Sequence, residues 1–178
     1  MKRIQLLPFG EFDSVLLANL SADLARAFSI PSEILEAGPD PSRAYNPERE
    51  QYSSTQILGM MSGHAATESC RLLGVTSLDL YIPILTFVFG EAQMGGACAV
   101  VSTHRLTQEF YGLPPDPDLL RARLLKEAVH EMGHTFSLPH CEYYECVMAP
   151  SHAVERIDLK THHFCPECRS RMLAAVSR

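Results

Sequence analysis

Two histidines and one glutamate stand at a spacing that could hold and use a metal ion. The segment His130-Glu131-Met132-Gly133-His134 places its two histidines four residues apart. In a helix, residues at this spacing lie on one face about one turn apart, so both imidazoles can bind the same ion. Glu131 could accept a proton from a zinc-bound water, whose pKa the metal lowers to about 7. The pattern therefore indicates the catalytic zinc site of a hydrolase.

His140 is the best candidate for a third ligand. A catalytic zinc ion usually has three protein ligands and one open position. His140 follows His134 by six residues, so it reaches the same ion only if the helix stops and the chain turns. Pro139 favours such a stop, because the residue before a proline disfavours helical backbone. A His-Glu-x-x-His segment also occurs by chance on helices, and the correctly spaced third histidine strengthens the catalytic interpretation.

Four of the six cysteines cluster near the C-terminus and could bind a second metal ion. Four thiolates form a closed tetrahedral zinc site, which is structural rather than catalytic. The alternatives are disulfides, which an expected reducing compartment disfavours, or a redox pair, which would follow a strand of a thioredoxin-like unit. We therefore predict two zinc ions, one catalytic and one structural. The cysteines of the predicted structural site are Cys141, Cys146, Cys165 and Cys168, whereas Cys70 and Cys98 are expected to be buried thiols.

Length and charge exclude several classes of protein. A chain of 178 residues suits one domain with at most a small appendage. A net charge of -6 gives no broad basic surface for nucleic acid or anionic lipid. The N-terminal apolar stretch is short and interrupted by Pro8, and no stretch is long enough to cross a membrane. We expect a soluble, cytoplasmic monomer with no nucleic-acid or membrane partner.

The elements that position these residues follow from hydrophobic periodicity. Strands are predicted at 3–7, 32–37, 78–89 and 97–103, and helices at 12–28, 53 or 54 to about 73, 119 to about 136, and 166–176. Asp13 or Ser14 could cap the first helix and Asp118 the third, while 38–50 reads as a loop. The order predicts an α/β fold with a mixed sheet. We divide it into an N-terminal subdomain at 1–137, with the active-site helix, and a small C-terminal subdomain at 138–178.

The chemistry-bearing residues together resemble the archaemetzincins, a branch of the metzincin metallopeptidases. The matching pattern is His130-Glu131-x-x-His134-x-x-Ser137-x-x-His140-Cys141-x4-Cys146-x-Met148, followed by Cys165-x-x-Cys168. The resemblance implies a zincin-like fold, in which a twisted mixed sheet carries an active-site helix and a small zinc-bound C-terminal subdomain. It implies that the three histidines hold the catalytic zinc, that Glu131 is the general base, and that the four cysteines hold a structural zinc. Met148 would be the Met-turn residue beneath the catalytic ion.

The implied activity is hydrolysis of peptide bonds, by an aminopeptidase or a small-peptide endopeptidase. The competing interpretation is a zinc-stabilised peptide-binding or regulatory module with little turnover. Glu131 favours catalysis, because binding alone requires no base. The strand predicted at 97–103 could be a sheet edge that pairs with an extended peptide. Pro150 and Ser151 could line the primed-side pocket.

Ser137 stands where metzincins carry glycine. That glycine lets the chain turn with a positive φ at the helix end. Serine can adopt the same backbone at a cost of about 1 kcal/mol. Since His140 and Cys141 are adjacent but would bind different ions, we expect the cysteine site to pin this turn. Tyr143 and Tyr144 either approach the metal or serve as packing residues. Surface or structural roles are expected for His64, His104, His152, His162 and His163.

Overall fold

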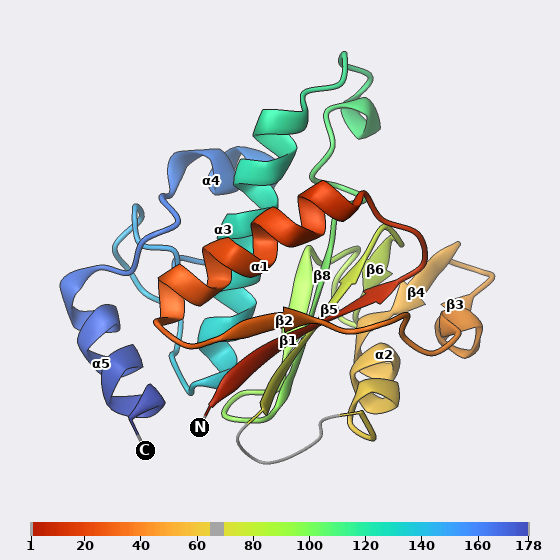
Figure 1. The fold of residues 1–178 in the computed structure, drawn as a ribbon. Coiled ribbons are helices and arrows are strands. Elements are labelled where there is room, and N and C mark those ends of the chain that lie inside the picture. Colours follow the sequence, from red (N-terminus) through yellow and green to blue (C-terminus); the bar gives the residue numbers. More distant parts are fainter. Residues whose placement is uncertain (1, 65–69, 178) are drawn as a thin grey trace.

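A five-stranded mixed sheet forms the centre of the fold (Figure 1). The computed structural model describes residues 2–64 and 70–177. The strand order is β2-β1-β5-β8-β7, in which β7 alone runs antiparallel to its neighbour. This arrangement confirms the predicted α/β class. The strands are β1 Arg3–Phe9, β2 Ser32–Ile34, β5 Cys70–Thr76, β7 Gly90–Ala92 and β8 Cys98–Ser102.

Helices cover both faces of this sheet, and alternating strand residues divide between them. Leu73 and Val101 pack with helices α1, Ser14–Phe28, and α3, Pro117–Thr135. Their neighbours Leu72 and Val100 pack with helix α2 on the other face. Successive side chains of a strand point to opposite faces, so strands buried on both sides are apolar at nearly every position. Helix α2 spans Ser54–Met61 and adjoins a small sheet of β3 Tyr45–Asn46, β4 Gln51–Ser53 and β6 Leu80–Tyr81.

The chain after α3 packs against the same side of the sheet as α1 and α3. It contains α4, Val154–Leu159, which was not predicted, and α5, Pro166–Val176, which was. Val147, Ile157 and Met172 belong to the apolar core that α1 and α3 share. Residues on both sides of position 137 thus share one core, and the division into two subdomains there stays a prediction.

The helix predicted from residue 53 or 54 to about 73 is wrong in its second half. Helix α2 ends at Met61, and residues 70–76 form β5 in the middle of the sheet. The part of the predicted helix at 65–69 lies outside the described residues. Ser62 and Gly63 form the turn after α2. The short apolar run that follows belongs to a strand buried on both faces, which periodicity alone does not distinguish from a buried helix.

The strand predicted at 78–89 is also wrong. Only Leu80–Tyr81 forms a strand, the following segment is a turn with Ile84 86% exposed, and Val88 returns to make a single antiparallel bridge with Leu80. Pro83 lacks the N–H that a central strand donates to its ladder. The segment crosses the surface beside the histidines instead of entering the sheet, which gives it a place in the site described below.

The strand predicted at 97–103 exists as β8, but it is not the edge of the sheet. It lies between β5 and β7, and β7 is the outer strand on that side. Any peptide that pairs with this edge must therefore pair with β7.

The helix starts follow side-chain capping. Asp13 accepts the N–H of Val15 at the start of α1, as predicted. For α3 the cap is Asp116 rather than Asp118, and its carboxylate accepts the N–H of Leu119 at 2.9 Å. The predicted loop at 38–50 contains a short 3₁₀ helix, Pro41–Ala44, and another spans Glu109–Tyr111. Within residues 2–64 and 70–177, the helices are too short or too polar to cross a membrane.

Candidate metal centres

The structure brings the three predicted histidine ligands together at the end of α3. His130 and His134 lie one turn apart on the helix and are buried. The Nδ1 of His130 donates to the carbonyl of Val147 at 2.8 Å, and that of His134 donates to the carbonyl of Leu138 at 2.7 Å. A proton on Nδ1 leaves Nε2 with a free lone pair, the form that binds a metal ion.

The positions of the ring nitrogens fit one metal ion. The Nε2 atoms of His130 and His134 lie 3.1 Å apart, and each carries a lone pair when Nδ1 holds the proton. Two such lone pairs repel each other unless a cation lies between them. Tetrahedral zinc with Zn–N bonds of about 2.0–2.1 Å would separate its ligand nitrogens by roughly 3.3 Å. His140 completes the set, with one nitrogen of each ring within 4.8 Å of the others.

A Schellman turn at the end of α3 reverses the chain and places His140 beside the other two histidines. Leu138 N–H donates to the Gly133 carbonyl and Ser137 N–H to the His134 carbonyl, which closes the helix end. Ser137 adopts a φ of 64°, so the serine occupies the left-handed backbone that glycine normally provides. Gly95, in the turn after β7, lies against it: a Cβ there would come within 2.7 Å of Ser137 Oγ. The absence of a side chain at Gly95 thus makes room for the serine.

We expect Ser137→Gly to stabilise the protein by roughly 0.5–1 kcal/mol, because glycine adopts a positive φ without strain. Urea denaturation of the metal-free protein measures this change. Ser29→Gly is the matched control, since Ser29 also has a positive φ, 56°, at the end of α1. A loss of stability in Ser137→Gly alone would show that the contact between the serine and Gly95 outweighs the strain.

Glu131 lines a cavity of about 310 Å³ together with His130 and His140. Pro150 and Ser151 form part of its wall, and their place in a primed-side pocket stays a prediction. The Glu131 side chain lies over the backbone of β7: a Cβ on Gly90 would be 2.7 Å from Glu131 Cγ. Burial, followed by the charge of Glu127, raises the pKa of Glu131 well above its usual value of 4.5. A raised pKa suits a group that must accept a proton.

Burial lowers the pKa of His130, His134 and His140 below the usual 6.5, and the charge of Lys160 acts in the same direction. Below pH 6.5 the unfolded chain therefore binds protons that the folded chain does not, which favours unfolding. We expect the free energy of unfolding of the metal-free protein to fall between pH 7 and pH 5.5. The Glu131→Gln background should be used, because the raised pKa of Glu131 has the opposite effect. A flat profile would contradict neutral, buried imidazoles.

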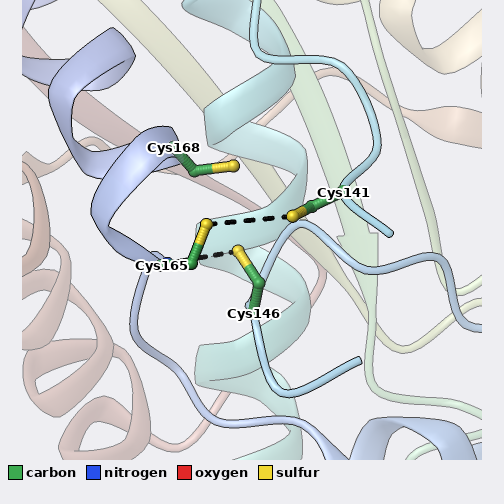
Figure 2. Close-up of side chains that lie close together, drawn as sticks. All are labelled: Cys141, Cys146, Cys165 and Cys168. Atoms are coloured by element: carbon green, nitrogen blue, oxygen red, sulfur yellow. Dashed lines mark hydrogen bonds between the residues drawn. The ribbon is translucent and has the colours of Figure 1, made fainter. Parts of the chain in front are cut away.

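The four predicted cysteines also converge, and their thiols point toward one another (Figure 2). Their sulfur atoms lie within 4.8 Å of one another, and the sulfurs of Cys141 and Cys165 are 3.8 Å apart. Tetrahedral zinc with Zn–S bonds of about 2.3 Å separates its sulfurs by roughly this distance, whereas a disulfide requires about 2.05 Å. The backbone N–H of Cys168 lowers the pKa of the Cys165 thiol, which favours the thiolate form. The set fits a closed metal site.

Met148 packs against α3 at Gly133, the residue before His134. It is fully buried, and a Cβ on Gly133 would come within 2.5 Å of its sulfur. Only glycine at the position before His134 allows this approach. Met148 also links the two candidate metal sites, because its carbonyl accepts the N–H of Cys141, one of the four clustered cysteines, at 2.9 Å.

A buried ion pair that sequence reasoning missed lies next to Glu131. Glu127 lines the cavity one turn before Glu131, and its Oε1 is 2.8 Å from Lys160 Nζ, with the two side chains 4% and 1% exposed. Lys160 Nζ also donates to the carbonyl of Ala149 at 3.1 Å. The lysine therefore joins the active-site helix to the segment that follows Met148. The spacing of Glu127 from Glu131 was the one available signal for this pair, and nothing in the sequence pointed to Lys160.

Other predicted residues lie elsewhere. The hydroxyls of Tyr143 and Tyr144 contact Glu145, both rings are exposed, and neither residue lines the cavity. His152 does line the cavity. Cys70 and Cys98 are buried in β5 and β8, as expected. Gly90 and the segment 85–89 contribute to the cavity, although their apolar sequence had suggested a buried strand.

Known proteins share this fold and much of this sequence. The profile of peptidase family M54 matches residues 24–174. The archaemetzincin of Methanocaldococcus jannaschii is 41% identical over 170 residues, which cover 96% of this chain and 92% of the relative. The crystal structure of archaemetzincin from Methanopyrus kandleri superposes with a TM-score of 0.87 at 34% identity, covering 99% of this chain and 96% of that one. A zinc-dependent peptidase from Methanocorpusculum labreanum superposes with a TM-score of 0.87 at 30% identity, covering 95% and 99%.

The fold, the candidate histidine and cysteine sites, and these relatives define a zinc metallopeptidase. The chain belongs to peptidase family M54, the family of the archaemetzincins, as the resemblance in its sequence indicated.

Proposed function

We propose that this chain hydrolyses peptide bonds at the three-histidine site, with Glu131 as the general base. The observation that carries the proposal is the pair of buried Nε2 atoms 3.1 Å apart, with Glu131 and an open cavity beside them. We further propose that the chain holds two zinc ions, one at the histidines and a structural one at the four cysteines. Separate clusters of nitrogen and sulfur ligands support this count.

Each group at the site has a separate role in the proposed hydrolysis. Zinc, when bound, supplies a Lewis acid that polarises the substrate carbonyl and lowers the pKa of water. Glu131 accepts the proton of the attacking water and can pass it to the departing amine, a transfer its raised pKa favours. The carbonyls of Val147 and Leu138 hold His130 and His134 in the ligand tautomer. Met148 and the buried ion pair of Glu127 with Lys160 keep the helix in place beneath them.

The substrate we propose is an extended peptide. Strand β7 is the outer strand on the side of the sheet nearest Glu131, so its free edge can pair with a peptide backbone. Pro150 and Ser151 on one side of the cavity and the segment 85–89 on the other would flank the side chains next to the scissile bond. We propose no nucleic-acid or membrane partner for this acidic chain.

The second candidate is a peptide-binding module without turnover, because the same ligands and edge strand would serve it. Incubating the zinc-loaded protein with a diverse peptide pool, followed by mass spectrometry of new termini, separates the two functions. We expect new termini with the natural chain and none with Glu131→Gln. The positions of the cuts also distinguish removal of N-terminal residues from internal cleavage. If both proteins bind peptides and neither cuts, the enzymatic proposal fails.

Coupling between the two metal sites follows from their shared segment. His140 and Cys141 are adjacent, and the carbonyl of Met148 holds Cys141. We expect replacement of Cys165 and Cys168 by serine to weaken zinc binding at the histidines by about tenfold, in the range of an outer-shell substitution. Competition with a chromogenic chelator measures the affinity. Replacing Cys70 by serine, far along the chain in β5, controls for loss of a buried thiol. Unchanged affinity at the histidines would refute the coupling.

A further inference from the structure

A second cavity, which shares no lining residue with the cavity at the histidines, lies between α1, α3 and α5. It measures about 720 Å³, more than the 310 Å³ of the cavity at the histidines. Figure 1 shows α5 standing beside α1, and residues of α1, α3 and α5 line the cavity. Small-molecule sites in proteins typically measure about 300–1,000 Å³, so this one is large enough for a ligand. None of the proposed zinc ligands lines it.

Part of the lining is apolar. Leu125 comes from α3, Met172 from α5, and Phe164 from the segment that leads into α5. Phe164 is held in place by edge-to-face contact with Phe28, with ring centroids 5.6 Å apart. An apolar part of a ligand would remove this surface from water.

The remainder of the lining is rich in cations. Arg26, Arg121, Lys126 and Arg169 face two acids, Asp23 and Asp118, which leaves an excess of two positive charges in a chain whose net charge is -6. Asp23 pairs with Arg26 and with Arg121 at 3.3 Å. Within the described part of the chain, no ion pair or hydrogen bond engages the guanidinium of Arg169. Its donors are therefore available to a ligand.

We infer that this cavity binds a small anion with an apolar body. A carboxylate or phosphate would accept hydrogen bonds from Arg169 and Arg121, whose planar guanidinium groups suit both anions. The apolar body would lie against Leu125, Phe164 and Met172. Arg26, Arg121 and Arg169 are exposed to solvent, but the apolar wall beside them favours a ligand with an apolar part over a purely anionic macromolecule.

Octanoate, octyl phosphate and inorganic phosphate are suitable probes for the zinc-loaded, full-length protein, with octanol as the uncharged control. Amide NMR signals of Leu125, Arg169 and Met172 report binding in the cavity. We expect saturable shifts with octanoate or octyl phosphate, weaker shifts with phosphate, and weaker ones again with octanol. Comparison of the first two probes identifies the preferred headgroup.

Arg169→Gln should weaken the binding of the preferred probe by about tenfold, the usual effect of losing a hydrogen bond to a charged group. Arg171→Gln is the matched control, because Arg171 lies on the same helix, pairs with Glu167 at 2.6 Å and does not line the cavity. We expect it to bind as the natural protein does. The proposal would be overturned if octanol bound as well as the charged probes, or if both variants lost binding equally. It would also fail if neither variant changed the shifts, because the probe would then bind elsewhere, for example at the histidines.

Discussion

Replacing Glu131 by glutamine is expected to lower kcat/KM by about 10²–10⁴, the usual contribution of a general base. Zinc should remain bound, because the three histidines and the hydrogen bonds to their Nδ1 atoms are unchanged. The metal-free variant should also unfold at a higher temperature. Burial raises the pKa of Glu131, so its ionised carboxylate destabilises the folded chain at neutral pH, and glutamine removes that charge.

The combination of these three results distinguishes a base from a structural residue. Steady-state hydrolysis, zinc content and thermal unfolding should be measured on the same preparations. Glu155→Gln is the control, since Glu155 is an exposed acid on α4. If Glu131→Gln loses zinc or stability together with activity, Glu131 supports the site and the proposed proton transfer is wrong.

Replacing Lys160 by methionine should destabilise the protein by about 3–5 kcal/mol, the effect of leaving a buried charge without its partner. Glu127 would then be buried among the histidines and Glu131 with no cation beside it. The contact of Lys160 with the carbonyl of Ala149 would also be lost. Chemical denaturation of the metal-free protein measures the change.

The double variant Glu127→Gln, Lys160→Met should recover much of this loss, since neither charge remains. Arg171→Met provides the matched control, because its pair with Glu167 is 54% and 72% exposed and such pairs contribute at most about 1 kcal/mol. If the double variant is as unstable as the sum of its single variants, the two groups do not act as a pair. The account of Lys160 as a link between α3 and the segment after Met148 would then fail.

The two candidate ligand clusters could be recognised in the sequence because the spacing of their residues is local. His130 and His134 depend only on the helical repeat, and Cys165 with Cys168 on a short turn at the start of α5. The ends of α1 and α5 followed from a capping residue, a proline and apolar periodicity, whereas α3 begins two residues before its predicted start because Asp116, and not Asp118, caps it. The sequence left open whether Ser137 takes a positive φ or the turn has another shape, and the structure shows a φ of 64°.

The central and edge strands were harder to predict because neighbours decide their positions. Strand β5 is buried on both faces, so its sequence lacks the alternation that marks a half-exposed strand. Strand β7 has only three residues, and its place as the outer strand depends on its pairing with β8. The ion pair of Glu127 with Lys160 joins residues far apart in the chain and has no local pattern. The need for glycine at Gly95 likewise comes from a neighbour distant in the sequence, because a Cβ there would collide with Ser137.

The most direct test of two metal centres is the zinc content of the purified protein with and without His140→Ala. Native mass spectrometry should find two zinc ions in the natural chain and one in the variant, because the four cysteines keep their own ion. Replacing Cys165 and Cys168 by serine should remove the other ion. Two ions retained in His140→Ala, or a single ion in the natural chain, would contradict separate histidine and cysteine centres.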